Sequence, residues 1–375
     1  MITFVHTADW QIGRPFNTFP ADVAGVLADA RLTAIDRVGE VARRSGARNV
    51  LVAGDVFDAS DVAGRLLRQP IDKLAHHDDL VWHLLPGNHD PVLPGGLWER
   101  LARAGPPANV LLHTMPVAVE IESGVWLLPS PVTAAHRSED PTQWMEDAVT
   151  PPHAVRIGLA HGSVRDFGDQ AEGLILPTRA KSSRLDYLAL GDWHGAVCIE
   201  PRTWYSGTPE IDRFVDNNPG QTLVVRIDHP GVQPAVEAVA TSRFIWTRRN
   251  ALIESAVDLD NVERDLLSSA SQPDRLIARL TLNGRLPVDD AAQLEVWRAK
   301  LDARLRHLEL DVSGVRISLA RFDSSQLGAG SELQAAADWL AAIAAEVDDS
   351  RRSLAEAAIV RLLALTEDHE NSAAA

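Results

Sequence analysis

The sequence predicts an α/β protein whose main part is a two-sheet sandwich flanked by helices, followed by a smaller α+β unit and C-terminal helices. Short apolar runs, rich in β-branched residues or leucine, recur through the first 240 residues. Nearly continuous apolar runs of this kind are typical of strands that are buried on both faces. Helical stretches such as residues 21–44 separate several of the runs, which favours a layered α/β arrangement.

The expected strands of the first part fall into two groups. Five runs end in clusters of polar residues, and they span residues 2–6, 49–55, 80–90, 155–162 and 185–195. Three other runs follow one another closely with only turns between them, and they span residues 109–113, 117–122 and 124–131. We assign these three runs to the second sheet. One further strand is expected at residues 222–228, after a turn-forming stretch.

The sequence pattern changes near residue 243. From there it alternates strand, helix, strand, helix, strand, which predicts a compact α+β unit. The chain then becomes rich in alanine and helical, and leucines recur on two stripes: Leu333, Leu340, Leu354, Leu362 and Leu365. We therefore expect three parts, at residues 1–240, 241–325 and 326–375.

The composition of the 375-residue chain indicates a soluble protein of the cytoplasm. Apolar residues make up 45% and charged residues 23%. The single cysteine, Cys198, excludes an intramolecular disulfide framework and a zinc site of the CxxC type. The apolar start of the chain breaks after five residues, unlike a signal peptide. No run reaches the roughly 18 apolar residues of a membrane span, so we expect no membrane association.

The chain is acidic, with a formal net charge of −16. A protein that holds nucleic acid by its own surface usually carries a basic face, and no basic block is visible here. If nucleic acid is the substrate, metal ions or a partner must supply positive charge.

Side chains that can bind metal follow five of the expected strands. These side chains are Asp9 with Gln11, Asp55, Asn88, His161, and Asp192 with His194. In α/β sheets the ligand site lies beyond the carboxyl ends of the strands, so we expect them to converge if the strands are neighbours. Mixed oxygen and nitrogen ligands suit Mn²⁺, Fe²⁺ or Zn²⁺. Seven ligands are enough for two such ions when one carboxylate is shared.

The motifs differ in how specific they are. A single Asp-x-Gln or Gly-Asp motif does not indicate a metal site by itself. Gly-Asp before a helix, for example, is usually a turn with an N-cap. The stretch "PGNHD" at residues 86–90 is more specific, since a Pro-Gly turn after a strand presents Asn88, His89 and Asp90 together. The ordered set of motifs, each at a strand end, is the strong signal.

Several stretches together resemble the calcineurin-like metallophosphoesterase superfamily, and within it the SbcD-type nuclease subunits of double-strand-break repair complexes. The stretches are "HTADWQIGRPF", "GDVFD", "PGNHD", "LAHG", "YLALGDWHG" and "WYSGTPEIDRF". They cover residues 1 to about 215 densely, whereas the later parts match only in order and size. The resemblance implies the metallophosphoesterase fold for the first part and a capping domain for the second.

The resemblance also implies roles for individual residues. Asp9, Gln11 and His194 would hold a first ion. Asn88, His161 and Asp192 would hold a second ion, and Asp55 would bridge the two. His89 would face the scissile phosphate and Asp58 would orient it. For Arg14, just after the first motif, contact with a phosphate and a place on the surface are both left open.

Two positions depart from the nuclease pattern, which has histidine at both. Gln11 offers a neutral amide oxygen, which is a weaker ligand than imidazole for Mn²⁺ or Zn²⁺. Asp192 adds a negative charge at the other ion. Neither residue removes the capacity to bind metal, so we expect a first ion that is held more weakly and not an inactive site.

The sequence thus predicts a nuclease that depends on two divalent ions, most simply Mn²⁺, with Fe²⁺ or Zn²⁺ as alternatives. The resemblance implies exonuclease activity on DNA in repair of double-strand breaks, with endonuclease activity left open. It further implies an SbcC-type coiled-coil ATPase as partner, bound through the C-terminal helices; a homodimer is left open. Two alternatives remain: a small-molecule phosphodiesterase or phosphatase on the same core, and a non-catalytic scaffold.

Overall fold

A computed structural model of the chain describes residues 1–133, 140–165, 174–319, 322–327, 330–345 and 351–373. The chain forms two compact units, Met1–Phe244 and Ile245–Ala375. The division falls a few residues after the expected boundary at 240, and the C-terminal helices belong to the second unit. Among the helices that the model describes, none combines the length and the apolar character needed to cross a membrane.

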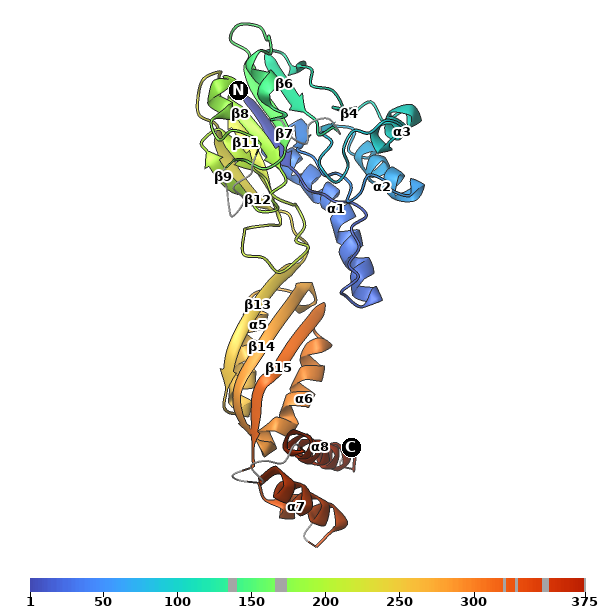
Figure 1. Cartoon of the computed structure of the whole chain (residues 1–375), viewed down its shortest axis with the longest axis vertical. Coiled ribbons are helices and arrows are strands. Elements are labelled where there is room, and N and C mark those ends of the chain that lie inside the picture. The colour runs from blue at the N-terminus through green and yellow to red at the C-terminus, as the bar shows by residue number, and fades with distance from the viewer. Residues whose placement is uncertain (134–139, 166–173, 320–321, 328–329, 346–350, 374–375) are drawn as a thin grey trace. The chain divides into compact units, whose positions relative to one another are not determined.

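The first unit is built on two six-stranded sheets (Figure 1). The first sheet has the spatial order β12 (Ala235–Ala240), β11 (Gln221–Ile227), β1 (Ile2–Thr7), β2 (Asn49–Val52), β3 (Val81–Leu84) and β4 (Val110–Leu112). Strands β1 to β4 run parallel; β11 pairs antiparallel with β1, and β12 pairs antiparallel with β11. This architecture confirms the predicted two-sheet α/β fold.

The second sheet also mixes parallel and antiparallel pairs. Its spatial order is β5 (Val119–Glu122), β6 (Val125–Ser130), β7 (Val155–His161), β8 (Tyr187–Gly191), β10 (Thr203–Tyr205) and β9 (Val197–Glu200). Strands β6, β7, β8 and β10 are parallel to one another. The assignment of residues 109–113 to this sheet was wrong: β4 pairs with β3 in the first sheet, because the helix before it returns the chain to the edge of that sheet.

Helices of the first unit cover the sheets. They are α1 (Ala21–Ser45), α2 (Gly64–Ala75), α3 (Leu97–Ala104), α4 (Arg179–Ser182) and the 3₁₀ turn η2 (Gln143–Glu146). Between the two sheets lies a core that includes Phe4, Leu159 and Tyr187, all fully buried. Burial on both faces explains why β1, β2, β7 and β8 read as continuous apolar runs.

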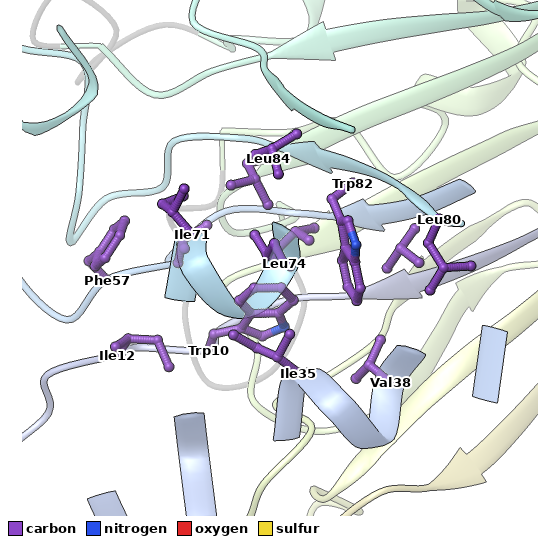
Figure 2. Packing of buried hydrophobic residues seen from close by; sticks show 14 of the residues in the cluster. Trp10, Ile12, Ile35, Val38, Phe57, Ile71, Leu74, Leu80, Trp82 and Leu84 are labelled. Atoms are coloured by element: carbon purple, nitrogen blue, oxygen red, sulfur yellow. The ribbon is translucent and has the colours of Figure 1, made fainter. Parts of the chain in front are cut away.

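A second core lies between the first sheet and helices α1 and α2 (Figure 2). Trp10 packs edge-on against Trp82 of β3, with ring centroids 5.9 Å apart, and Ile35 of α1 and Leu74 of α2 belong to the same cluster. The indole Nε1–H of Trp10 donates to Thr7 Oγ1 at 3.1 Å. Trp10 is therefore a core residue that anchors the loop after β1, with a candidate metal ligand on either side of it.

The second unit has the predicted order of strands and helices. Its elements are β13 (Ile245–Ile253), α5 (Ala256–Ser268), η3 (Pro273–Arg275), β14 (Leu276–Pro287), α6 (Val288–Asp302), β15 (His307–Ser318), η4 (Ser324–Leu327), α7 (Glu332–Ala345) and α8 (Arg352–Ala373). The three strands form a parallel sheet in the order β13-β14-β15. Residue Ser255 forms the N-terminal capping box of α5 together with Asp258.

The C-terminal helices contribute to the core of the second unit. Ala337 of α7 and Ile359 and Leu363 of α8 are buried in the cluster that contains the strands of its sheet. Leu340 packs against the same cluster, so it does not belong to a free leucine stripe as the sequence suggested. Leu333 and Leu354 remain exposed, whereas the side chain of Leu365 lies outside the described residues.

Candidate metal centre

The loops that follow β1, β2, β3, β7 and β8 bring the predicted ligands together. The backbone N–H of Asp192, after β8, donates to both carboxylate oxygens of Asp9, after β1, at 3.1 and 3.3 Å. His161, at the end of β7, contacts Asn88 from the loop after β3. These contacts join loops of the first sheet to loops of the second, so the site forms where the carboxyl ends of the two sheets meet.

The backbone is strained at four of the candidate ligands. Asp9, Gln11, Asp55 and Asp192 have φ angles of 54°, 43°, 52° and 109°. Residues other than glycine rarely adopt positive φ, and such strain gathers at functional sites. The strain at the first two loops is held by backbone hydrogen bonds from Asp9 N–H to Gly54 O and from Gln11 N–H to Asp55 O. The loops after β1 and β2 therefore fix each other.

Glycines allow the loops to approach closely. A Cβ on Gly87 would lie 2.1 Å from Asp55 Oδ1, and a Cβ on Gly191 would lie 1.9 Å from Ala53 O. At Gly54, which has a φ of 87°, a Cβ would lie 2.3 Å from His161 Nδ1. Glycine is thus required for steric reasons at three positions around the site.

One side of the site is rich in carboxylates, and we call it the acidic half. It consists of Asp9, Asp55, Asn88, His161 and Asp192. Ligand atoms of Asp9, Asp55 and His161 all lie within 4.8 Å of one another. His161 Nε2 lies 3.1 Å from Asn88 Oδ1, 3.4 Å from Asp55 Oδ1 and 3.9 Å from Asp192 Oδ1. Ser163 donates a hydrogen bond to Asp192 Oδ2 at 2.7 Å and holds that carboxylate in place.

The electrostatics of the acidic half favour a cation. Burial by itself lowers the pKa of His161, but the negative charges of Asp55, Asp9 and Asp192 outweigh burial and raise this pKa to about 9. Burial raises the pKa of the Asp9 carboxyl well above its usual range, and the nearby Asp55 and Asp192 add to the effect. The contributions of the carboxylates to both pKa shifts express the negative potential of the acidic half.

The acidic half fits a divalent ion. His161 Nδ1–H donates to Ala53 O at 2.8 Å, which leaves Nε2 as the ring nitrogen that faces the oxygens of Asp55 and Asn88. Ligands at roughly 2.0–2.2 Å from one ion lie about 3–4 Å from each other, as these atoms do. One imidazole among several oxygens is a donor set that suits Mn²⁺, Fe²⁺ or Zn²⁺.

The other side of the site carries positive charge, and we call it the arginine half. It consists of Gln11, His194, Arg14, Arg31, Asp212 and Arg213. Gln11 Oε1 accepts a hydrogen bond from Arg14 at 2.6 Å and lies 3.5 Å from Arg31. The amide nitrogen of Gln11 lies 3.2 Å from His194 Nε2. Arg213 donates to the other ring nitrogen of His194 at 2.6 Å.

Asp212 holds the three arginines together. Its carboxylate lies 2.8 Å from Arg31, 3.1 Å from Arg14 and 3.3 Å from Arg213. Burial raises the pKa of Asp212, but the neighbouring ring of His194, whose Nδ1 lies 3.8 Å away, and the charges of Arg31 and Arg14 outweigh burial and lower this pKa strongly. Arg31 is itself buried in α1 and also donates to Trp10 O at 2.8 Å. This network fixes the loop that carries Gln11.

His89 lies beside the acidic half and is half-exposed. Its backbone N–H donates to Asp55 Oδ1 at 2.9 Å, and its Nε2 lies 3.9 Å from Asp55 Oδ2. Its ring Nδ1 bonds to the backbone carbonyl of Asp58 at 2.9 Å, whereas the Asp58 carboxylate is 3.9 Å away. Asp58 thus contacts His89 mainly through its backbone carbonyl, which occupies Nδ1. The other ring nitrogen of His89, Nε2, is the one that could contact a substrate.

Several residues that support the site have no clear signal in the sequence. Arg31, Ser163 and Asp212 were not among the candidate residues, because each lies far along the chain from the group it contacts. Asp90 fixes its loop, because its carboxylate accepts hydrogen bonds from the N–H groups of Gly87 and Phe57. Arg14 contacts Gln11 and Asp212 and its side chain is 26% exposed, so contact with a phosphate stays a prediction.

The comparisons with known proteins identify the first unit. A family model described as calcineurin-like phosphoesterase matches residues 2–196, more than half of the chain. No curated protein matches the chain. Among solved structures, that of TT1561 from Thermus thermophilus is 13% identical, covers 64% of this chain and 99% of its own, and has a TM-score of 0.42. This last likeness is too low to carry an argument.

Proposed function

The chain belongs to the calcineurin-like phosphoesterase family, and we propose that it is a metal-dependent DNA nuclease of double-strand-break repair that works with an SbcC-type ATPase. Membership of the family implies metal-dependent hydrolysis of phosphoesters. The choice of DNA as substrate goes further. It is supported by the resemblance of the motifs to SbcD-type subunits and by the arginines on the sheet of the second unit.

The residues of the site can divide the chemistry of hydrolysis among them. Asp9, Asp55, Asn88, His161 and Asp192 would hold a divalent ion, which would supply charge to the phosphate and make a water molecule a better nucleophile at neutral pH. The backbone N–H of His89 donates to Asp55, and the hydrogen bond from ring Nδ1 to the Asp58 carbonyl fixes the orientation of the ring. With both ring nitrogens protonated, His89 would donate the Nε2 proton to the leaving oxygen and become the neutral ring that keeps its Nδ1–H on the Asp58 carbonyl.

The sheet of the second unit has a polar face that supports the choice of DNA. Strand alternation and register place Arg248, Arg279, Arg285 and Arg316 on the same face. Buried residues such as Leu280, Leu282 and Leu286 alternate with the arginines of β14 and point to the core. The acidic side chains Glu309 and Asp311 share the polar face, so its surplus of positive charge is modest. This face would contact the phosphate backbone weakly, which agrees with the need for a partner in an acidic chain.

The test compares two substrates on the full chain. With Mn²⁺ present, we expect cleavage of linear DNA and of a chromogenic aryl phosphodiester. The double variant Arg285→Glu, Arg316→Glu should lose about tenfold or more of the DNA cleavage and leave the aryl diester unaffected, because only DNA has a phosphate backbone for that face to bind. The control is Arg264→Glu on α5, which should change neither activity. Hydrolysis of the aryl diester without any cleavage of DNA would favour the small-molecule alternative, and no hydrolysis of either would favour the scaffold.

For the ATPase partner, the exposed residues of α7 are the best contact. Leu333 is 43% and Trp339 is 63% exposed. Large apolar side chains with this much exposed surface are typical of a surface that binds another protein. The double variant Leu333→Glu, Trp339→Glu should abolish co-purification with an SbcC-type ATPase. These substitutions are preferable to deletion of α7 and α8, because those helices also contribute to the core of the second unit.

The matched control for this contact is Val257→Glu, at an exposed position on α5. An equal loss of co-purification in the control, or continued binding of the ATPase by the double variant, would contradict this contact.

A further inference from the structure

We propose that this protein binds a single catalytic divalent ion, in the acidic half, and that Arg14 and Arg213 supply the phosphate with the positive charge that a second ion would bring. This inference rests on the proposed function only in that the substrate is a phosphodiester. It departs from the expectation of two ions, and it starts from the contacts of Gln11 and His194.

Gln11 does not present a ligand atom to an ion. The amide oxygen is the only atom of its side chain that could bind a metal, and it accepts a 2.6 Å hydrogen bond from Arg14. Arg31 lies 3.5 Å from the same oxygen. Because two guanidinium groups converge on that oxygen, the amide NH₂ group is the part that faces His194. An amide NH₂ group donates hydrogen bonds and offers no lone pair to a cation.

His194 has no free lone pair either. Arg213 donates to Nδ1 at 2.6 Å, and Gln11 Nε2 lies 3.2 Å from Nε2. A neutral imidazole has one lone pair, and N–H groups approach both of its nitrogens. By contrast, three oxygens face His161 Nε2 in the acidic half.

The charges of the two halves lead to the same conclusion. Three guanidinium groups meet one carboxylate at Asp212, which leaves the arginine half with a surplus of positive charge. A divalent ion placed there would be repelled. The acidic half has three carboxylates, Asp9, Asp55 and Asp192, around one histidine. On this view Asp55 binds one ion and does not bridge two.

The arginines are suited to take over the task of binding the phosphate. The side chains of Arg14 and Arg213 are 26% and 46% exposed, so both reach solvent at the site while their shared carboxylate is buried. Planar guanidinium groups bind phosphate oxygens with paired hydrogen bonds. Donors that are already in place stabilise charge that develops in the transition state. Arg31 is buried and acts as a positioning residue, since it holds Asp212 and the backbone of Trp10.

The first test counts metal ions and needs no substrate. The full chain is stripped with a chelator, equilibrated with Mn²⁺, and examined by isothermal titration calorimetry and electron paramagnetic resonance. We expect one ion per chain and the spectrum of an isolated Mn²⁺. Two ions per chain, a spectrum from a coupled pair, or no bound ion would overturn the proposal. None of these outcomes depends on whether DNA is the substrate.

The second test separates phosphate binding from metal binding. Arg14→Gln and Arg213→Gln should each lower hydrolysis of an aryl phosphodiester by about 10- to 100-fold, the usual cost of losing a hydrogen bond to a charged group. Both should still bind one Mn²⁺ with unchanged affinity. The control Arg44→Gln removes an exposed arginine of α1 and should change neither quantity. Unchanged hydrolysis in both variants, or loss of the ion from either, would overturn the role of the arginines.

Discussion

The acidic half and the arginine half of the site have nearly the same backbone origin but opposite charge. Asp9 belongs to one and Gln11 to the other, although only Trp10 separates them. Both residues have positive φ angles, and the backbone N–H of each donates a hydrogen bond to the loop after β2. The difference arises from what surrounds them: carboxylates from several loops in one case, and three arginines on Asp212 in the other. One scaffold can therefore place a cation-binding half beside a half that is already cationic.

The largest effect is expected from Asp55→Asn, which removes one negative charge from the acidic half and keeps the shape of the side chain. Asp55 contacts both the backbone of His89 and the ring of His161. Because loss of even a residue behind a metal ligand costs about 10- to 100-fold in affinity, loss of a ligand charge should cost more than about 100-fold. Calorimetric titration with Mn²⁺ measures this, and hydrolysis of an aryl diester should fall to background. Retained affinity would show that the acidic half does not hold the ion.

The next largest effect concerns His89, which tests whether catalysis and metal binding can be separated. His89→Ala should lower hydrolysis by about 10²- to 10⁴-fold, the usual contribution of a group that transfers a proton. The variant should bind Mn²⁺ as the unaltered protein does, because the contact with Asp55 that matters for position comes from the backbone N–H. If the affinity falls as far as in Asp55→Asn, His89 is a ligand and its assigned role is wrong.

A smaller effect should follow from Gly87→Ala, which alters only the geometry of the acidic half. The added Cβ would lie 2.1 Å from Asp55 Oδ1 and 2.4 Å from the Asp55 backbone nitrogen, so the carboxylate must move. We expect Mn²⁺ affinity to fall by about tenfold or more, as when the support of a ligand is lost. Gly25→Ala in α1 is the matched control: its Cβ meets nothing within 4 Å, and it should bind metal normally and gain about 0.4–1 kcal/mol of stability. Equal affinities for the two variants would mean that Asp55 can move without consequence.

The smallest effect is expected from Gln11→His, which tests what keeps metal out of the arginine half. Imidazole is a stronger ligand than an amide oxygen, so a second, weaker binding step for Mn²⁺ should emerge in the titration. The arginines remain in place and limit its affinity. A second step as strong as the first would show that Gln11 alone excludes the ion and that the surrounding charge matters little.

Local sequence was enough to predict most of the fold. A strand that is buried on both faces must be apolar along its whole length, so β1, β2, β7 and β8 were recognisable without knowledge of their partners. Strands β9 (Val197–Glu200) and β12 (Ala235–Ala240) were missed, because they are short, partly exposed along their whole length, and not followed by a cluster of polar ligand residues. The sheet of β4 was assigned wrongly, because a strand's neighbours depend on the path of the chain and not on its own residues.

The sequence by itself determined which residues stand at the strand ends, because each motif is a short stretch directly after an apolar run. It therefore provided Asp9, Asp55, Asn88, His89, His161 and Asp192 as a set, and the structure brings these together. Only the tertiary structure decided what Gln11 and His194 contact. Arg31 approaches Gln11 from α1, and Asp212 and Arg213 reach the site from a loop about 200 residues further along the chain. The charge that surrounds a ligand is a sum over groups brought together by folding, and no local pattern encodes that sum.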